Sequence, residues 1–98
     1  MLADLTCEHF EHRVNQVSRV SFDSGDLEFR LVECRRLKSR GRSEGDREPF
    51  SLTFLGPRLP VLPQRIYNFD FGELGAFDVF IVPIGSDRSG TTYEAVFA

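Results

Sequence analysis

Tryptophan is absent from this sequence of 98 residues and methionine occurs once, whereas phenylalanine occurs ten times. Phenylalanine has no polar group, so a core built from its rings does not need a hydrogen-bond partner for each of them. A chain of this length can form a single core, and a hydrophobic content of 41% is enough to fill it. We therefore expect one β-rich domain over residues 1–98.

Long hydrophobic runs are also missing. The longest strongly apolar run, residues 79–84, is short and contains Pro83. A transmembrane helix needs a run of about 20 apolar residues, and the first residues lack the basic and apolar regions of a secretory signal. We expect a soluble protein that stays in the cytoplasm and does not bind a membrane.

Cysteine and histidine occur only twice each, which limits the chemistry that the chain can perform. Cys7, His9 and His12, with Glu8 and Glu11, are close in sequence and share a predicted helix. The two histidines supply only two ligands, however, and no other cysteine or histidine except Cys34 exists to complete a tetrahedral metal site. We interpret them as ordinary surface residues and predict no metal and no cofactor. The spacing of Cys7 and Cys34 matches no zinc or redox motif, so we expect two reduced thiols, with a disulfide as the alternative.

The residues that catalysis would require are absent as well. No signature links either cysteine to a positioned base, so nucleophilic catalysis has no candidate. The glycine-containing segment at residues 85–90 lacks the lysine and the following helix of a phosphate-binding loop. We therefore predict that the protein is not an enzyme.

Fifteen acidic residues outnumber twelve basic ones, and the formal net charge of −3 disfavours binding to nucleic acid or anionic lipid over the whole surface. Basic residues gather in one segment that has almost no apolar residues, and we predict a mobile loop at residues 36–47. Aromatic residues that would stack on bases are missing from it, so we expect no nucleic acid. A solvated loop is the simplest interpretation, and docking of an acidic partner is the alternative. The residues concerned are Arg35, Arg36, Lys38, Arg40 and Arg42.

Large apolar residues alternate with polar ones along most of the chain. Because successive side chains of a strand point to opposite faces, this pattern is typical of half-buried antiparallel strands. We expect Phe29, Phe54 and Phe77 in the core, and Phe80 with Val82 on the opposite face of their strand. Six strands are predicted, at residues 17–22, 27–34, 50–55, 66–71, 76–84 and 91–97.

One short helix is predicted at residues 7–14, before the first strand. Thr6 is a suitable N-cap, and Leu5 and Phe10 have the spacing of a hydrophobic staple. Phe10 and Val14 lie four positions apart, so both can face the sheet. Either this helix covers the face that carries Phe80 and Val82 or something else does.

The fold class follows from these elements. The chain has no helices for parallel crossovers, so we predict a mainly β protein: a small six-stranded antiparallel barrel or sandwich, arranged as a meander, with a short N-terminal helix. Pro57, Pro60 and Pro63 recur every third residue, which indicates an extended polyproline-like crossing between two strands.

Several motifs resemble a small bacterial family that is catalogued only as a domain of unknown function. They are LTCEHF at residues 5–10, EPFSLTF at 48–54, LPQ at 62–64, LGA at 74–76, FIVPIG at 80–85 and YEAVF at 93–97. Members of that family are often encoded near proteins with phage-tail-collar domains. The resemblance implies an accessory or structural role in a tail-like assembly, and it implies no catalytic residues.

Three classes of function remain, and the sequence favours a protein-interaction or assembly module. Such a module would bind a protein partner through strand edges or through apolar residues such as Phe80 and Val82, and formation of a homo-oligomer stays open. A small barrel that binds an apolar ligand is the alternative, although six short strands tend to fill their own interior. An enzyme is the least favoured class.

Overall fold

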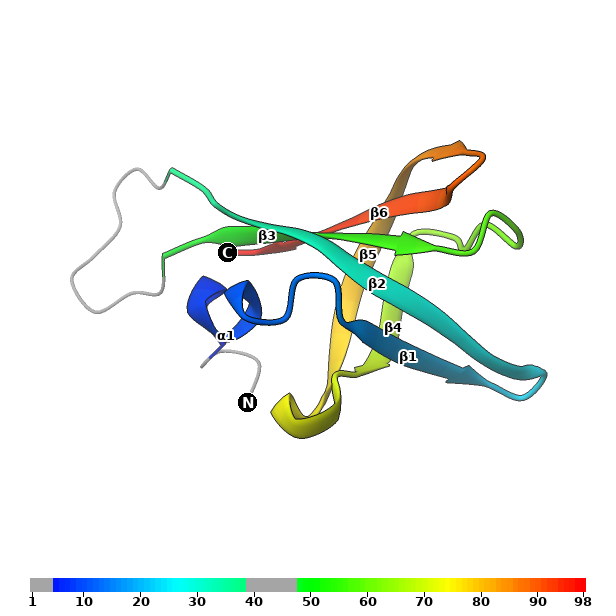
Figure 1. Cartoon of the computed structure of the whole chain (residues 1–98), viewed down its shortest axis with the longest axis horizontal. Coiled ribbons are helices and arrows are strands. Elements are labelled where there is room, and N and C mark those ends of the chain that lie inside the picture. The colour runs from blue at the N-terminus through cyan, green and yellow to red at the C-terminus, as the bar shows by residue number, and fades with distance from the viewer. Residues whose placement is uncertain (1–4, 39–47) are drawn as a thin grey trace.

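The computed structural model describes residues 5–38 and 48–98, in which one short helix precedes six strands (Figure 1). The predicted helix and the six predicted strands all correspond to observed elements, with small shifts of their ends. The elements are α1 (Cys7–Glu11), β1 (Val17–Phe22), β2 (Gly25–Arg36), β3 (Phe50–Gly56), β4 (Arg65–Asp70), the 3-10 turn η2 (Gly72–Leu74), β5 (Ala76–Asp87) and β6 (Gly90–Phe97).

The strands form a closed antiparallel barrel in the order β1-β2-β3-β6-β5-β4. The prediction of a six-stranded antiparallel barrel is therefore confirmed, and the sandwich alternative is not adopted. The order differs from a continuous meander, in which β3 would lie beside β4. Instead, two three-stranded meanders, β1-β2-β3 and β4-β5-β6, join along β3–β6 and along β1–β4.

The barrel interior is filled by aromatic side chains. Phe29, Phe54, Phe69 and Tyr93 are fully buried, and their rings lie 5.0 to 5.4 Å apart in three pairs. Phe29 and Phe54 were predicted to be buried. Phe77 was predicted to be buried too, but it is only partly so, because it lies at the start of β5 and packs against the rim of the core.

Two β-bulges change the phase of the long strands β2 and β5. The pairing of β2 with β3 shifts between Leu31 and Glu33, so Val32 is an extra residue. Before the bulge Leu31 points inward, and after it Cys34 lies opposite the buried Leu52. Simple alternation from Leu31 would place Cys34 on the outer face. A second shift in β5, between Pro83 and Gly85, makes Ile84 the extra residue.

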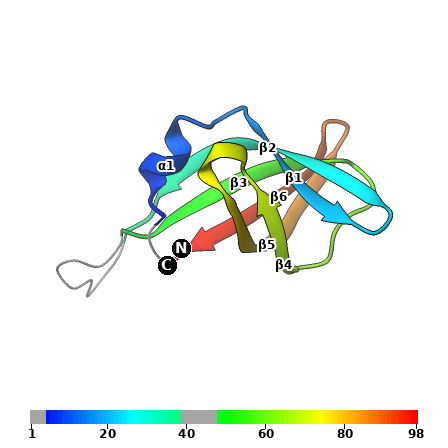
Figure 2. The same cartoon turned by 90° about the horizontal axis from the view of Figure 1, so that it is seen from below.

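Helix α1 closes one end of the barrel (Figures 1 and 2). Phe10 is completely buried there, and its ring contacts the rings of Phe50, Phe71 and Phe97 at 5.4 to 6.1 Å. The predicted staple residue Leu5 is also buried. The helix thus covers the barrel end and not the outer face of a strand.

The helix is shorter than the predicted range 7–14. It ends at Glu11, and the following turn contains Asn15 with φ of 77°, a conformation that a helix cannot include. The Asn15 N–H donates to the carbonyl oxygen of Leu31 at 2.7 Å, and the Leu31 N–H donates to the carbonyl oxygen of Gln16 at 3.0 Å. These bonds to β2 redirect the chain into β1.

The proline-containing segment at residues 57–64 closes the other end of the barrel and contains no strand, as predicted. It links β3 to β4, which lie on opposite sides of the barrel. The backbone N–H of the buried Leu62 donates to the phenolic oxygen of Tyr93 at 2.8 Å. The Leu59–Pro60 peptide bond is cis. Tyr93 therefore supplies a hydrogen-bond acceptor from inside the barrel to the segment that covers it.

Candidate functional site: an outer apolar patch and an incompletely paired seam

The predicted contact residue Phe80 lies on the outer face of the barrel. It pairs across the β4–β5 ladder with Ile66, so the two side chains are direct neighbours. Their exposed fractions are 47% for Phe80 and 62% for Ile66. Inward-facing Val79 and Ile81, on either side of Phe80, are almost completely buried. The alternation along β5 therefore presents a large aromatic ring to solvent.

Two valines extend this surface onto β6. Val82, the second predicted contact residue, is half-buried and lies opposite Glu94 on β6. Val96 lies two residues beyond Glu94 on the same face of β6 and is 59% exposed. We refer to the set Ile66, Phe80, Val82 and Val96 as the outer apolar patch. Sequence reasoning found Phe80 and Val82 but missed Ile66 and Val96, which the pairing of three strands brings onto the same face.

Helix α1 does not cover the outer apolar patch, because its buried face meets the barrel end near Phe50 and Phe97 (Figures 1 and 2). A polar pair borders the patch along the β4–β5 ladder, where the side-chain amide of Asn68 donates to a carboxylate oxygen of Asp78 at 3.0 Å. The patch thus has a polar boundary on that side, as protein interfaces commonly have.

The predicted basic contact residues lie elsewhere. Arg35 and Arg36 form the end of β2, on the opposite side of the barrel from β5, so the structure does not bring them together with Phe80 and Val82. Lys38 is exposed, and Arg40 and Arg42 lie outside the described residues.

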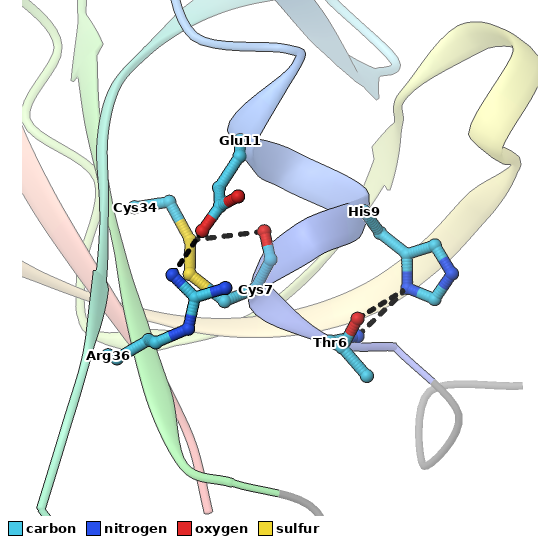
Figure 3. The surroundings of a disulfide bond; sticks show 6 residues. All are labelled: Thr6, Cys7, His9, Glu11, Cys34 and Arg36. Atoms are coloured by element: carbon cyan, nitrogen blue, oxygen red, sulfur yellow. Dashed lines mark hydrogen bonds and ion pairs between the residues drawn. A yellow bond between two sulfur atoms is a disulfide. The ribbon is translucent and has the colours of Figure 1, made fainter.

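The predicted loop boundary at residue 36 is wrong. Arg36 belongs to β2, where it pairs with Phe50, and its guanidinium forms an ion pair with the Glu11 carboxylate of α1 (Figure 3). The next residue is also held, because the Leu37 N–H donates to the carbonyl oxygen of Pro49 at 2.9 Å. Residues 39–47 of the predicted loop lie outside the described part of the chain, so their predicted mobility stays a prediction.

The expectation of two reduced thiols is contradicted, because Cys7 and Cys34 form a disulfide (Figure 3). Their Cα atoms are 6.3 Å apart, within the range that a disulfide spans. The physical reason is the bulge at Val32, which turns Cys34 toward the barrel end where α1 presents Cys7. Sequence spacing gave no sign of this proximity, since it depends on where the helix packs.

An open hollow of about 760 Å³ lies between α1 and the η2 turn. His9, His12 and Arg13 line one side, and Gly72 and Glu73 line the other. The His9 side chain caps the start of α1, where its Nδ1 accepts a hydrogen bond from the backbone N–H of Thr6 at 2.9 Å (Figure 3). Within residues 5–38 and 48–98, no three histidine, cysteine or acidic side chains are grouped so as to hold a metal ion.

The junction of β1 and β4, which we call the β1–β4 seam, differs from every other strand junction. Its register consists of a single pair, Arg19 with Asp70, whereas β1 forms six pairs with β2. Farther from this pair, aromatic side chains bridge the two strands, with the rings of Phe22 and Tyr67 in edge contact at 6.0 Å. Sequence reasoning missed this seam because neighbouring strands of a barrel cannot be assigned from alternation alone.

Tyr67 is fixed at this seam by a hydrogen bond from its hydroxyl to the carbonyl oxygen of Pro63, at 2.8 Å. Burial raises the pKa of the Tyr67 phenol, and the opposing effect of the nearby Arg65 charge is smaller. The neutral phenol, which can donate this bond, is therefore the form that the folded protein favours.

A second hollow, about 230 Å³ in volume, lies beside Phe22, the residue of β1 whose ring contacts that of Tyr67. Most of its larger side chains are apolar, and they come from the β1–β2 hairpin and from the proline-containing segment. We call it the seam hollow; it is lined by Phe22, Ser24, Gly25, Asp26, Leu27, Pro60 and Leu62.

In the part of the chain that the structure describes, no helix is long and apolar enough to cross a membrane. Comparisons with curated proteins and with solved structures gave no match. A family model does match, over residues 5–97, and the chain therefore belongs to DUF6916, a domain of unknown function.

Proposed function

We propose that this DUF6916 domain is a non-enzymatic protein-interaction or assembly module that binds its partner through the outer apolar patch. The observation that carries the proposal is the cross-strand pair of Ile66 and Phe80, whose side chains are 62% and 47% exposed. Single exposed apolar residues are common on protein surfaces, but a contiguous set on one face marks an interaction site more often.

Phe80 has a large apolar ring whose burial against a partner would favour binding. Complete burial of a phenylalanine side chain contributes about 1.5 to 3 kcal/mol, and aromatic residues are enriched in the centre of protein interfaces. Val82 and Val96 would add apolar area around it, and the pair formed by Asn68 and Asp78 would lie at the rim. Such a surface suits a protein partner with a complementary apolar face.

The packing of the interior favours this proposal over a barrel that binds an apolar ligand. Phe29, Phe54 and Phe69 occupy the space that a ligand would need, and both barrel ends are covered by the chain itself. A small barrel of this kind has an interior that its own side chains fill.

The family resemblance adds a candidate context, an accessory or structural role in a phage-tail-like assembly. Assembly components work by repeated protein contacts, which a compact barrel with an apolar outer surface can provide. Products of genes that neighbour the gene for this chain are the first partners to test.

The experiment compares three baits in affinity capture from cells that express the chain: the wild type, Phe80→Glu and the control Val32→Glu. Val32 has a similar exposed fraction, 44%, but lies on β2, on the opposite side of the barrel. A charge in a dry interface is costly, so Phe80→Glu should lose a partner that Val32→Glu retains. Mass spectrometry would identify the captured proteins.

Circular dichroism of each bait tests whether the fold is intact. If Phe80→Glu unfolds the chain, the milder variants Ile66→Ser and Val96→Ser replace it as tests of the same surface. A partner that all of the folded patch variants retain would contradict the proposal.

A further inference from the structure

The β1–β4 seam leaves two strand edges without a complete ladder. All six residues of β4 pair with β5, and all six of β1 pair with β2. On their other sides, however, the two strands share only the pair of Arg19 with Asp70 within the described residues. From that pair the strands diverge toward the seam hollow.

An incompletely paired strand edge requires hydrogen-bond partners for its backbone N–H and C=O groups. Each strand residue carries one N–H donor and one C=O acceptor, and alternate residues direct both groups toward the neighbouring strand. Side-chain contact between Phe22 and Tyr67 holds the strands together but pairs none of these groups. A peptide in extended conformation supplies donors and acceptors at the matching spacing, which is the basis of β-strand addition.

The seam hollow adjoins this edge through Phe22, the last residue of β1, whose ring contacts that of Tyr67 on β4. It is bounded by the tip of the β1–β2 hairpin and by Pro60 and Leu62, which precede β4 in the chain. Its volume of about 230 Å³ is enough for one apolar side chain. In β-strand addition, backbone bonds give affinity, and pockets for alternate side chains give specificity.

On the outer face, Ile66 lies on β4 itself and connects the free edge with the outer apolar patch. A strand added along β4 would therefore have an apolar neighbour on its outward side as well. Its inward side chain would meet Phe22, Leu27 and Leu62 in the hollow.

We propose that the β4 edge at residues 65–68, with the seam hollow beside it, binds an extended segment of a partner protein by β-strand addition, with one apolar side chain of that segment in the hollow. This inference goes beyond the proposed function, because it gives a protein partner a second way to bind. It differs from that function in its site, since the outer apolar patch could bind a folded surface without any added strand.

The probe is a displayed library of random peptides of about ten residues, which is long enough to form a strand. The library is selected on the immobilised whole chain with its disulfide intact. Peptides that are enriched should alternate apolar and polar residues. In two-dimensional NMR spectra, they should shift the backbone amide signals of residues 20–22 and 65–68 more than those of β3 and β6.

A matched pair of variants locates the binding site. Ser24 lines the seam hollow, and Ser24→Trp should fill it with an indole ring. Ser89 occupies the equivalent place in the β5–β6 hairpin, since both serines are exposed and precede a glycine with positive φ. Ser24→Trp should weaken binding of the selected peptides about tenfold or more, and Ser89→Trp should leave it unchanged.

The outcomes separate this inference from the proposed function. If no peptide is enriched, or if Ser24→Trp binds the peptides as the wild type does, the β-strand addition is wrong. Amide shifts confined to residues 80–82 and 94–96 would also overturn it while leaving the outer apolar patch in place. Conversely, peptides that bind Phe80→Glu normally but not Ser24→Trp support strand addition, even if the capture experiment on the patch fails.

Discussion

The two three-stranded halves of this barrel are joined by two seams that work by different means. Along β3–β6 the halves share seven register pairs, from Phe50 with Phe97 to Gly56 with Thr91. Along β1–β4 they share one pair, and the rings of Phe22 and Tyr67 are in contact across the junction. Backbone pairing fixes a junction in both register and distance, whereas contact between rings tolerates small displacements.

This difference shows that the closure of a small barrel does not have to be uniform. The β3–β6 seam stabilises the core of the barrel, because buried residues of both strands, such as Phe54 and Tyr93, pair directly across it. The β1–β4 seam has less backbone pairing, and regions with few backbone hydrogen bonds open at lower free energy. The more stable β3–β6 seam and the more accessible β1–β4 seam thus lie on opposite sides of the barrel.

The largest effect is expected at the β3–β6 seam. Phe54→Ala removes a fully buried ring that contacts Phe69 and Phe71, and it should lower the free energy of unfolding by about 3 to 5 kcal/mol. Urea denaturation followed by circular dichroism would measure this loss. A loss below about 1 kcal/mol would show that the interior can rearrange around the missing ring.

The disulfide gives the next largest effect. Cys34→Ser removes a link that closes a 27-residue separation and ties α1, which precedes β1, to β2. The loss in the free energy of unfolding should be about 3 to 4 kcal/mol from loop-closure entropy. Reductant should destabilise the wild type by a similar amount and leave Cys34→Ser unchanged. Equal stability of the wild type with and without reductant would contradict the stabilising role of the link.

The smallest effect is expected at the β1–β4 seam. Tyr67→Phe keeps the ring contact with Phe22 but removes the hydrogen bond to Pro63, and it should cost about 1 kcal/mol at neutral pH. Because the pKa of Tyr67 is raised in the folded protein, the phenol ionises first in the unfolded chain, near pH 10.

Stability that depends on the neutral phenol is therefore complete below about pH 10 and is lost as the pH rises toward the pKa of the folded protein. The difference in the free energy of unfolding between the wild type and Tyr67→Phe should narrow above about pH 10. Denaturation series from pH 7 to 11 would measure it. A difference that stays constant would show that Tyr67 ionises equally in both states.

The strands could be predicted from the sequence because alternation is local. The apolar residues of the segment around Phe54 point to one face, and those around Phe29 do so until Leu31. Alternation alone does not place Cys34, since the bulge at Val32 is not visible in the pattern and reverses the phase beyond Leu31. Phe77 is partly exposed for another reason: it lies at the start of β5, at the rim of the core, and the local alternation does not show where the barrel ends.

The candidate site, too, could be predicted only where it depends on local alternation. Phe80 and Val82 were identified because a bulky residue on a polar face interrupts the local pattern. Ile66 could be added only when β4 and β5 were known to pair in register, and the seam hollow only when the strand order was known. Strand neighbours and registers depend on contacts that are distant in sequence, and no local pattern encodes them.

The aromatic contacts under α1 also bear on the time course of folding. Phe10 precedes the first strand, and its ring meets that of Phe97 at the end of the last strand. This end of the barrel therefore cannot form until β6 has left the ribosome, although α1 is made before any of the six strands. A protein with such distant contacts should fold slowly, in milliseconds to seconds, and expose Phe10 and its partners to chaperones until synthesis reaches β6.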